Sequence, residues 1–376
     1  MSAGSARSRF GIRVRVIARA LRDRPARRRP PADPRRILIA HHLLLGDTLM
    51  VSALVAKLRA NHPQADIAMT VPRAFAPLYV ARPWGLRVLP WDTRDVPQAL
   101  FDEAPFDLAF VPGDNRHGWL AAAMRARWIV AFAGDRPVSK NWPIDRLVPY
   151  PGDPGSWGDM VARLAEGHPP PPYAPSQWPA GPSTPFDLPR HAYAVLHVGA
   201  STPLKQWQGE RWLEIAARLA MRGIEPVWSA GSAEADLVRL ADRRARYRSY
   251  AGALDLAQMR ALLDRARLVV SPDTGVAHLA RIAGAPSVTL FGPGSATITG
   301  PGRFHAATPW RAVTVDPFPC RNQHVLFRRE IPWVTRCGRT TAECAHPRCM
   351  DAIDVDAVAA AVDDVLSRPD PRGAMR

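Results

Sequence analysis

The sequence of 376 residues contains only three lysines and has no cysteine before position 320. It also lacks any run of eighteen or more apolar residues, so it offers no candidate transmembrane helix. Its four cysteines are too few and too clustered for the disulfide framework of a secreted domain, and we expect reduced thiols. No apolar stretch with a signal-peptidase-like end occurs near the N-terminus. We therefore expect an intracellular, cytoplasmic protein.

Positive charge is distributed unevenly along the chain. The formal net charge is +16, and residues 1–36 carry twelve arginines against two aspartates, which supplies +10 of that total. A nucleic-acid-binding protein usually spreads its basic surface over the folded domain, so nucleic acid is not an expected partner. We interpret residues 1–35 as a basic arm that precedes a globular chain with a cleft for anionic ligands. The apolar fraction of 47% is sufficient for buried cores.

The basic arm has an apolar pattern of its own. Phe10, Val14, Ile17 and Leu21 recur at helical spacing among the arginines. This pattern is typical of a basic amphipathic helix that lies on an anionic membrane surface. A disordered basic tail explains the same composition equally well, and the pattern alone leaves both interpretations open.

Two α/β segments follow the arm, with a proline-rich stretch between them. In residues 36–168, short apolar runs alternate with helical patterns, including a helix expected over residues 119–127. Prolines crowd residues 169–190, where we place an interdomain linker. The alternation resumes in residues 191–350, and residues 351–376 form a C-terminal helix and tail. This order predicts an α/β protein with two Rossmann-like, doubly wound parallel sheets.

The strongest local signal lies in residues 268–280, where an apolar run passes through Asp273 and Thr274 directly into a helical pattern. Such a junction is typical of a strand that feeds a helix N-terminus, where free N–H groups and the helix dipole favour an anion. Asp273, Thr274 and His278 should project at the mouth of this turn. The following strand ends in a second turn, Gly292-Pro293-Gly294. The sequence therefore predicts a phosphate-binding site at the carboxyl edge of a parallel sheet.

Three short motifs occur in order along the two α/β segments. The first is an opening strand with a Gly46-Asp47 turn, the second contains Lys205-Gln206-Trp207, and the third contains Ser271-Pro272-Asp273-Thr274-Gly275. Each motif is weak alone. In this order and at these separations they resemble glycosyltransferase family 9, the ADP-heptose lipopolysaccharide heptosyltransferases. The resemblance covers residues 36–365.

The resemblance implies a GT-B fold, in which two Rossmann-like domains face each other across a cleft. It implies an inverting transferase that moves heptose from ADP-L-glycero-D-manno-heptose to a lipid A-linked inner-core acceptor of lipopolysaccharide. The partners are then a nucleotide-sugar donor and a lipid-linked saccharide, met at the inner face of the inner membrane by a cytoplasmic or peripheral protein. Where many members carry a further Gly-Asp pair, this sequence has Leu43-Leu44.

Other functions remain open at this point. A GT-B transferase with a different nucleotide sugar, or with a protein acceptor as in autotransporter heptosyltransferases, has the same motifs. A non-catalytic nucleotide-sugar-binding protein is the alternative outside the enzymes. Leu43-Leu44 favours that alternative, whereas the presence of Asp47, Lys205 and Asp273 opposes it.

Asp47 and Lys205 are the candidate catalytic residues. The resemblance places a general base on the Gly-Asp turn, where the Asp47 carboxylate would take the proton of the acceptor hydroxyl. The structural alternative for Asp47 is the N-cap of a helix that begins at Thr48. Lys205 would stabilise the negative charge of the departing diphosphate. Its alternative is a solvated surface lysine.

The candidate donor-binding residues lie after strands of the second domain. Asp273 would accept hydrogen bonds from sugar hydroxyls, with a helix cap as its alternative, and His278 would contact phosphate or hold the loop. Gly275 lacks a β-carbon and lets the backbone approach the diphosphate. The resemblance places Glu234 near the adenosine ribose. The full set is Ser201, Thr202, Glu234, Asp273, Thr274, Gly275 and His278.

The four cysteines lie in a loop-rich segment, residues 317–350, of the second domain. Cys320, Cys337, Cys344 and Cys349 are candidate ligands of a structural zinc or iron ion. The spacing lacks paired C-x2-C motifs, so reduced thiols are the alternative. No cofactor is expected for catalysis.

Overall fold

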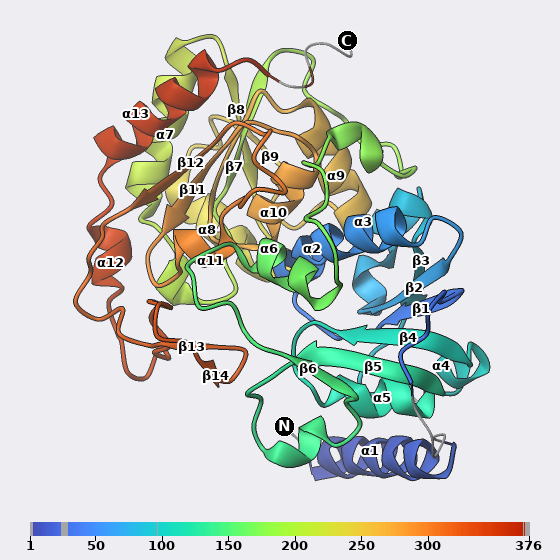
Figure 1. The fold of residues 1–376 in the computed structure, drawn as a ribbon. Coiled ribbons are helices and arrows are strands. Elements are labelled where there is room, and N and C mark those ends of the chain that lie inside the picture. The colour runs from blue at the N-terminus through green and yellow to red at the C-terminus, as the bar shows by residue number, and fades with distance from the viewer. Residues whose placement is uncertain (1–2, 24–28, 96, 371, 373–376) are drawn as a thin grey trace. The chain divides into compact units, whose positions relative to one another are not determined.

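The computed structural model describes residues 3–23, 29–95, 97–370 and 372, with side chains from residue 11 on. The chain forms two compact units. Unit 1 comprises residues 1–154, 158–171 and 325–333, and unit 2 comprises residues 155–157, 172–324 and 334–376. Each unit is built on its own parallel sheet (Figure 1).

The sheet of unit 1 has six parallel strands in the order β3-β2-β1-β4-β5-β6. The chain order reverses between β1 and β4, and such a switch point is where doubly wound sheets bind ligands. Ile37, Leu38 and Ile39 of β1 are buried on both faces of the sheet, which explains why these three positions are all apolar. The strands are β1 (Arg36–Ile39), β2 (Asp66–Val71), β3 (Arg87–Pro90), β4 (Phe106–Val111), β5 (Ala126–Phe132) and β6 (Arg146–Val148).

Helices and a small hairpin complete unit 1. The helices are α1 (Ala3–Asp23), α2 (Leu45–Met50), α3 (Ser52–Asn61), α4 (Gln98–Asp102), α5 (His117–Ala123) and α6 (Trp157–Val161, in unit 1 from Gly158). The antiparallel hairpin pairs β13 (Val325–Leu326) with β14 (Arg329–Glu330). The predicted helix over residues 119–127 is wrong at its C-terminal end. Arg125 takes a left-handed φ of 57°, and β5 begins at the next residue.

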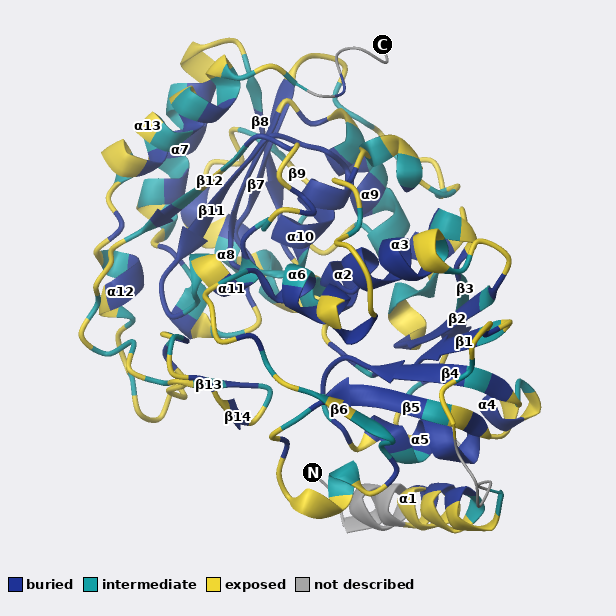
Figure 2. Cartoon of the chain, in the orientation of Figure 1, coloured by how far each residue is buried: buried dark blue, intermediate teal, exposed yellow. Residues whose placement is uncertain are grey.

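The basic arm contains a helix that packs on unit 1. Ile12, Val16 and Ala20 of α1 are buried in the same apolar core as residues of α5 (Figure 2). Arg19 adds two contacts, with its guanidinium 4.4 Å from the Phe101 ring centroid and its Nε donating to the Ala123 carbonyl at 3.0 Å. The alternative of a disordered tail is therefore wrong for residues 3–23.

The buried face of α1 is not the face that the sequence pattern suggested. Val14, Ile17 and Leu21 are 48%, 37% and 67% exposed, and the side chain of Phe10 lies outside the described residues. At about 100° per residue, this stripe is centred roughly 130° around the helix axis from the stripe of Ile12, Val16 and Ala20. The helix thus has two apolar stripes, one packed on unit 1 and one open to solvent.

The sheet of unit 2 has the same topology, with the order β12-β11-β10-β7-β8-β9 and a switch point between β10 and β7. Its strands are β7 (Tyr193–His197), β8 (Glu225–Ser229), β9 (Arg248–Ser249), β10 (Leu268–Pro272), β11 (Ser287–Phe291) and β12 (Trp310–Thr314). Its helices are α7 (Gly209–Met221), α8 (Ala235–Ala241), α9 (Leu256–Arg265), α10 (Gly275–Ile282), α11 (Ala296–Thr299), α12 (Arg348–Asp351) and α13 (Val355–Ser367). The predicted α/β class with two doubly wound sheets is confirmed.

Two predicted boundaries need correction. Residues 172–190, expected to be an interdomain linker, belong to unit 2 because their aromatic side chains fill its core. Tyr173 is 1% exposed, and its hydroxyl donates to the Ile282 carbonyl at 2.7 Å. Residues 325–333, expected in the second domain, belong to unit 1.

Within the described parts of the chain, every helix is too short or too polar to cross a bilayer.

Candidate functional site

Asp47 lies in the first turn of α2, directly after β1 at the switch point of unit 1. The N-cap of α2 is Leu44, so the alternative role of Asp47 as an N-cap is wrong. As the third helical residue, Asp47 places its carboxylate near the positive end of the helix dipole. The residue is partly exposed and lines a cavity of about 840 Å³. Asp47 is therefore accessible to a ligand in that cavity, as a general base must be.

All residues that line this cavity belong to unit 1. We call it the Asp47 cavity. Its apolar lining is formed by Ile12, Val16, Ile17, Leu43, Leu44, Trp91, Trp119, Leu120 and Phe327. Its charged lining comprises four cations and two carboxylates, namely Arg13, Arg116, Lys140, Arg328, Asp47 and Asp114. An apolar wall with an excess of positive charge suits a ligand that has both an apolar part and an acidic group.

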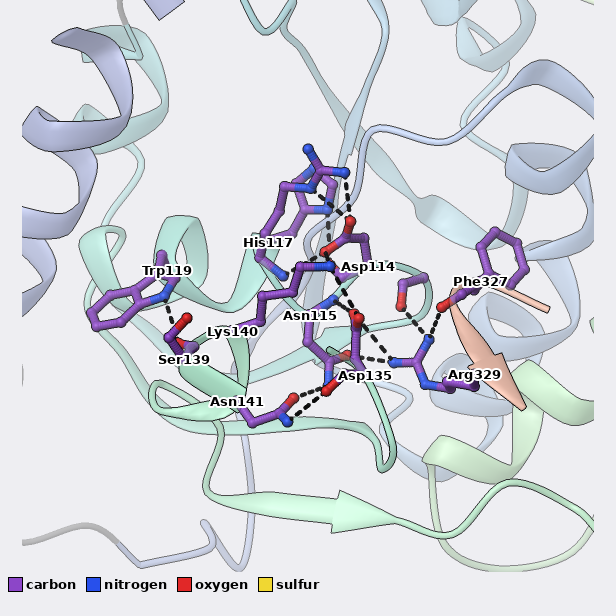
Figure 3. Close-up of polar contacts among 12 residues, drawn as sticks. Asp114, Asn115, His117, Trp119, Asp135, Ser139, Lys140, Asn141, Phe327 and Arg329 are labelled. Atoms are coloured by element: carbon purple, nitrogen blue, oxygen red, sulfur yellow. Dashed lines mark hydrogen bonds and ion pairs between the residues drawn. The ribbon is translucent and has the colours of Figure 1, made fainter. Parts of the chain in front are cut away.

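A network of ion pairs supports one side of the Asp47 cavity (Figure 3). Asp114 follows β4 and accepts a hydrogen bond from Arg116 Nε at 2.7 Å. Lys140 Nζ lies 3.0 Å from Asp114 Oδ1 and 3.0 Å from the buried Asp135 Oδ1. Burial opposes ionisation of Asp114, but hydrogen bonds from Arg116 and Lys140 outweigh it and hold its pKa well below the usual range. Asp114 therefore stays charged and holds both cations in place.

Arg329 fixes the β13–β14 hairpin to unit 1. Its side chain is 2% exposed, and its guanidinium uses five N–H groups to bond five acceptors. The acceptors are Asn115 Oδ1 and the carbonyls of Gly113, Phe132, Ala133 and Phe327, at 2.8 to 3.3 Å. Asp135 Oδ2 lies 3.7 Å away and supplies the opposing charge. This arginine explains why residues 325–333 are part of unit 1.

Replacement of Arg329 with Met should destabilise unit 1 by about 3–5 kcal/mol, because it leaves buried acceptors unpaired and removes a buried charge partner. Urea unfolding followed by near-UV circular dichroism measures this loss. Arg328→Met is the matched control, since Arg328 is the exposed neighbour on the same hairpin. Equal stability of the two variants would contradict the anchoring role of Arg329.

In unit 2, the structure brings Lys205 and Asp273 together at the switch point. Lys205 Nζ donates to the Asp273 carbonyl at 2.8 Å and to Asp273 Oδ2 at 3.0 Å. Thr299 Oγ1 donates to the other carboxylate oxygen at 3.0 Å. Burial opposes ionisation of Asp273, but the adjacent Lys205 ammonium outweighs it and lowers the pKa. The structural alternatives are wrong for both residues. Lys205 is not a solvated surface lysine, because it is paired with Asp273, and Asp273 is not the cap of α10, because the N-cap of that helix is Thr274.

Buried basic groups surround this pair. His278 contacts Arg281 on the next turn of α10, and burial lowers the pKa of His278 well below its usual value, so the imidazole is neutral. Burial lowers the pKa of Arg281 to about 10, which leaves the guanidinium charged at neutral pH. The two positive charges of Lys205 and Arg281 exceed the single negative charge of Asp273 by one. The centre thus carries a net positive charge beside the N-terminus of α10, as an anion site requires.

The other predicted donor-binding residues lie in the loops around this centre. Among the described residues, the buried Thr274 hydroxyl has no hydrogen-bond partner. Thr202 caps a short 3-10 helix that ends at Lys205, with Oγ1 3.4 Å from Leu204 N. Glu234 accepts a hydrogen bond from Ala200 N at 2.7 Å and so fixes the same loop. Gly275 begins α10, and Ser201 is exposed. Their contacts with a donor stay predictions.

Four buried histidines in addition to His278 give a test of the fold by pH. Burial lowers the pKa of each far below the usual 6.5, to about 3 for His41 and His305 and about 4 for His117 and His197. Below pH 6.5 the histidines of the unfolded chain take up protons, whereas the same histidines stay neutral in the folded chain. The free energy of unfolding should then fall by about 1.4 kcal/mol per histidine for each pH unit below 6.5. Urea titrations between pH 7.5 and 5 measure this, and a constant midpoint would contradict it.

The four cysteines line a second cavity, of about 410 Å³, in unit 2. Cys337 and Cys349 are buried, Cys320 and Cys344 are half-buried, and burial raises the pKa of the Cys349 thiol. Within the described residues, no group of three or more His, Cys, Asp or Glu side chains is placed to hold a metal ion. The four thiols therefore gather in one place but are not arranged as a ligand set. A structural zinc or iron ion at these cysteines stays a prediction.

Several residues of both sites were not predicted from the sequence. Asp114 follows β4 as Asp47 follows β1, so the rule that placed Asp273 also applied to Asp114. Arg281 lies three residues after His278 on the same helical face, which was a usable signal. Thr299 and the hairpin residues Phe327 and Arg328 carry no local signal, because only tertiary packing brings them to the sites.

Two doubly wound units, each with polar residues at its switch point, define the protein as one of the GT-B class of α/β folds. The fold of the solved E. coli ADP-heptose lps heptosyltransferase II is similar, with a TM-score of 0.67 and 18% identity over 88% of this chain and 98% of that one. E. coli heptosyltransferase WaaC, solved with ADP, gives a TM-score of 0.65 and 17% identity over 88% and 99%. The predicted GT-B fold is confirmed.

Residues 169–323 match the model of glycosyltransferase family 9 (heptosyltransferase), which confirms the resemblance found in the sequence. Lipopolysaccharide heptosyltransferase 1 of Escherichia coli (strain K12) is 34% identical over 103 residues. That match covers 27% of this chain and 32% of the relative, so it spans about a third of the relative's length. The matched family segment contains Lys205, Asp273 and their neighbours.

Proposed function

We propose that the protein is an inverting glycosyltransferase that moves heptose from ADP-L-glycero-D-manno-heptose to a lipid A-linked inner-core acceptor. The observation that carries the proposal is the Lys205–Asp273 centre at the N-terminus of α10, inside the segment that matches family 9. Support for the donor comes from the WaaC structure with ADP. Support for the acceptor comes from lipopolysaccharide heptosyltransferase 1 as a partial relative.

In this proposal unit 2 binds the donor diphosphate. Two of the three N–H groups of Lys205 Nζ bond Asp273, which leaves one for a phosphate oxygen among the described contacts. The excess positive charge of the centre stabilises the diphosphate as its bond to the sugar breaks. The buried Thr274 hydroxyl adds a donor at the helix N-terminus. Asp273 then has two roles, because it holds the Lys205 ammonium in position and also faces the donor.

Unit 1 supplies the base in this proposal. Asp47 takes the proton of the acceptor hydroxyl while that oxygen bonds the anomeric carbon and ADP departs with the bonding electrons. Attack opposite the departing diphosphate inverts the anomeric configuration. No step of this displacement calls for a metal ion.

Binding of nucleotide sugars to the wild-type protein tests the donor assignment. We expect calorimetry to detect ADP-heptose and ADP, and to detect no heat of binding for UDP-sugars. Preferential binding of a UDP-sugar would leave the fold assignment unchanged and would contradict ADP-heptose as the donor. Absence of binding by every nucleotide sugar would favour a non-catalytic protein.

We also propose that the protein works at an anionic membrane surface through the exposed stripe of α1. Val14 and Leu21 are exposed on this stripe, and Arg13, Arg15 and Arg22 are exposed on the same helix. Apolar side chains flanked by arginines are suited to anionic lipids.

The Leu21→Asp variant should therefore lose sedimentation with phosphatidylglycerol vesicles, because a carboxylate replaces an apolar side chain at the lipid surface. Val80→Asp is the control, since Val80 is 58% exposed on unit 1 but lies outside α1. Equal binding of Leu21→Asp and wild type, or equal loss in both variants, would contradict this role of the helix.

A further inference from the structure

The four cysteines of unit 2 line one cavity whose walls include segments next to the Lys205–Asp273 centre. We call it the cysteine cavity. Leu204 and Pro293 line it together with the four thiols. Leu204 directly precedes Lys205, and Pro293 lies in the turn that follows β11. The cysteine cavity and the Lys205–Asp273 centre are therefore built in part from the same stretches of chain.

The turn after β11, residues 292–294, is packed tightly between the cysteine cavity and Asp273. A β-carbon on Gly292 would lie 3.3 Å from Cys349 Sγ, and a β-carbon on Gly294 would lie 2.4 Å from Asp273 Oδ2. The second distance is far inside van der Waals contact, so the absence of a side chain is what permits this close approach. Because packed interiors transmit strain, a movement on the cysteine side of the turn reaches the Asp273 carboxylate.

Cys337 and Cys349 both contact this turn, although they come from different segments of the chain. Cys337 N donates to the Pro293 carbonyl at 2.9 Å, and Cys349 Sγ lies beside Gly292. Burial raises the pKa of the Cys349 thiol, and the nearby Cys337 adds to this effect. The two thiols are thus close neighbours on opposite parts of one turn.

Arg339 distinguishes Cys337 from Cys349. Its guanidinium nitrogen lies 3.7 Å from Cys337 Sγ, and this contact raises the pKa of Arg339 above its ordinary value. A cation beside a sulfur stabilises negative charge on that sulfur and so assists its attack on an oxidant. Cys349 is buried and keeps its proton. The pair therefore offers one thiol for attack on an oxidant and a second thiol to complete a disulfide.

We propose that Cys337 and Cys349 form a reversible disulfide that controls donor binding. Cys337 Sγ takes one oxygen of hydrogen peroxide to give a sulfenic acid, and the other oxygen leaves as water. Cys349 Sγ then attacks the Cys337 sulfur, the S–S bond forms, and the sulfenic oxygen leaves as a second water with the Cys349 proton. Two thiols are oxidised and one peroxide is reduced. The control of donor binding rests on the proposed function, whereas the disulfide itself does not.

The disulfide should weaken donor binding. A disulfide holds its two sulfurs well inside van der Waals contact, so its formation draws the segment at Cys337 towards α12, which contains Cys349. The turn at residues 292–294 contacts both cysteines and moves with them, and this shifts the Asp273 carboxylate that holds the Lys205 ammonium. We expect the affinity for ADP-heptose to fall about tenfold, a usual size for coupling between two sites.

Peptide mapping of the full-length protein tests the disulfide without any donor. Reduced protein is treated with hydrogen peroxide and digested without reductant, and the peptides are identified by mass spectrometry. We expect one linkage, between Cys337 and Cys349, which dithiothreitol reverses. Separate oxidation of the two sulfurs without a linkage, a linkage between other cysteines, or a bound metal ion that keeps all four thiols reduced would each overturn the proposal.

Calorimetry with ADP-heptose then measures the control of donor binding. Wild-type protein should bind ADP-heptose less tightly after peroxide treatment and regain its affinity in dithiothreitol. Equal affinity in both states would overturn the control. Absence of donor binding even by the reduced protein would overturn the proposed function and the control with it, whereas the mapped disulfide would still support the modification site.

Serine variants locate the effect. Cys337→Ser and Cys349→Ser should bind ADP-heptose equally before and after peroxide treatment. Cys344→Ser is the matched control and should respond as wild type does, since Cys344 lines the same cavity but its thiol donates to the His346 carbonyl at 3.3 Å. A response that survives in Cys337→Ser, or is lost in Cys344→Ser, would overturn this pairing. Reversal by dithiothreitol in wild type needs no variant, so it stays decisive if a serine variant fails to fold.

Discussion

Replacement of Asp47 with Asn should lower the rate of heptose transfer by about 10²–10⁴-fold, the usual contribution of a general base. The amide has the shape of the carboxylate but does not accept the proton of the acceptor hydroxyl. Asp47 belongs to unit 1, whereas the proposed donor-binding residues Lys205 and Asp273 belong to unit 2, so calorimetric affinity for ADP-heptose should be unchanged. Single-turnover transfer and donor titration together measure both quantities.

The stability of the Asp47→Asn variant should change little. Leu44, not Asp47, is the N-cap of α2, so the substitution removes only a dipole interaction of about 0.3–1 kcal/mol. Asp153→Asn is a matched control at an exposed position outside the cavity, and it should transfer heptose at the wild-type rate. Wild-type transfer by Asp47→Asn would remove Asp47 from the mechanism.

Replacement of Lys205 with Met should lower the transfer rate by about 10²–10³-fold, comparable to the loss of one donor that stabilises charge in a transition state. The affinity for ADP-heptose should fall less than the rate, because the charge on the diphosphate grows as its bond to the sugar breaks. Rapid-quench measurements at saturating donor, alongside donor titration, give the two effects separately.

A double variant separates the chemical role of Lys205 from its structural role. Lys205→Met leaves the Asp273 carboxylate buried without its ammonium partner, which by itself costs stability. In Lys205→Met with Asp273→Asn, the buried carboxylate that lost its ammonium partner is gone as well, so the stability should recover while the rate stays low. Recovery of the rate together with the stability would contradict a direct role of Lys205 in transfer.

The sheets could be predicted because their central strands are short apolar runs bounded by turn residues. β10 passes directly into α10, as the apolar run and turn of residues 268–280 predicted. α9 begins with a local signal of the same kind, a capping box in which Asp255 Oδ1 accepts a hydrogen bond from Gln258 N at 2.8 Å. Such local signals determine local structure because the relevant bonds lie within a few residues.

The features that could not be predicted depend on contacts between residues that are distant in sequence. Both apolar stripes of α1 have helical spacing, and only the packing of the helix against α5 determines which one is buried. Arg329 is a charged residue in a loop-rich segment, and its burial depends on acceptors about two hundred positions earlier in the chain. Edge strand β6 is short and half-exposed, so it lacks the apolar run that identified the central strands.

The candidate site was predictable in its donor half and much less so in its acceptor half. Asp273 and Thr274 lie on one continuous strand–turn–helix junction, and Lys205 has a motif of its own. The Asp47 cavity, in contrast, is assembled from α1, the loops after β1 and β4, and a hairpin near residue 328. Asp47, together with Leu43 and Leu44 just before it, comes from a segment that the sequence identified, whereas α1 and the hairpin carried no signal for this cavity.

Transfer to a lipid acceptor is the measurement that tests the proposed function most directly. Wild-type protein is incubated with ADP-heptose and a lipid A-linked core that lacks heptose, and ADP release and the lipid product are followed by mass spectrometry. We expect ADP release that depends on the acceptor, with one heptose attached to the lipid, and neither result with Asp47→Asn. Binding of ADP-heptose without transfer to that acceptor, or equal transfer by Asp47→Asn, would contradict the proposal.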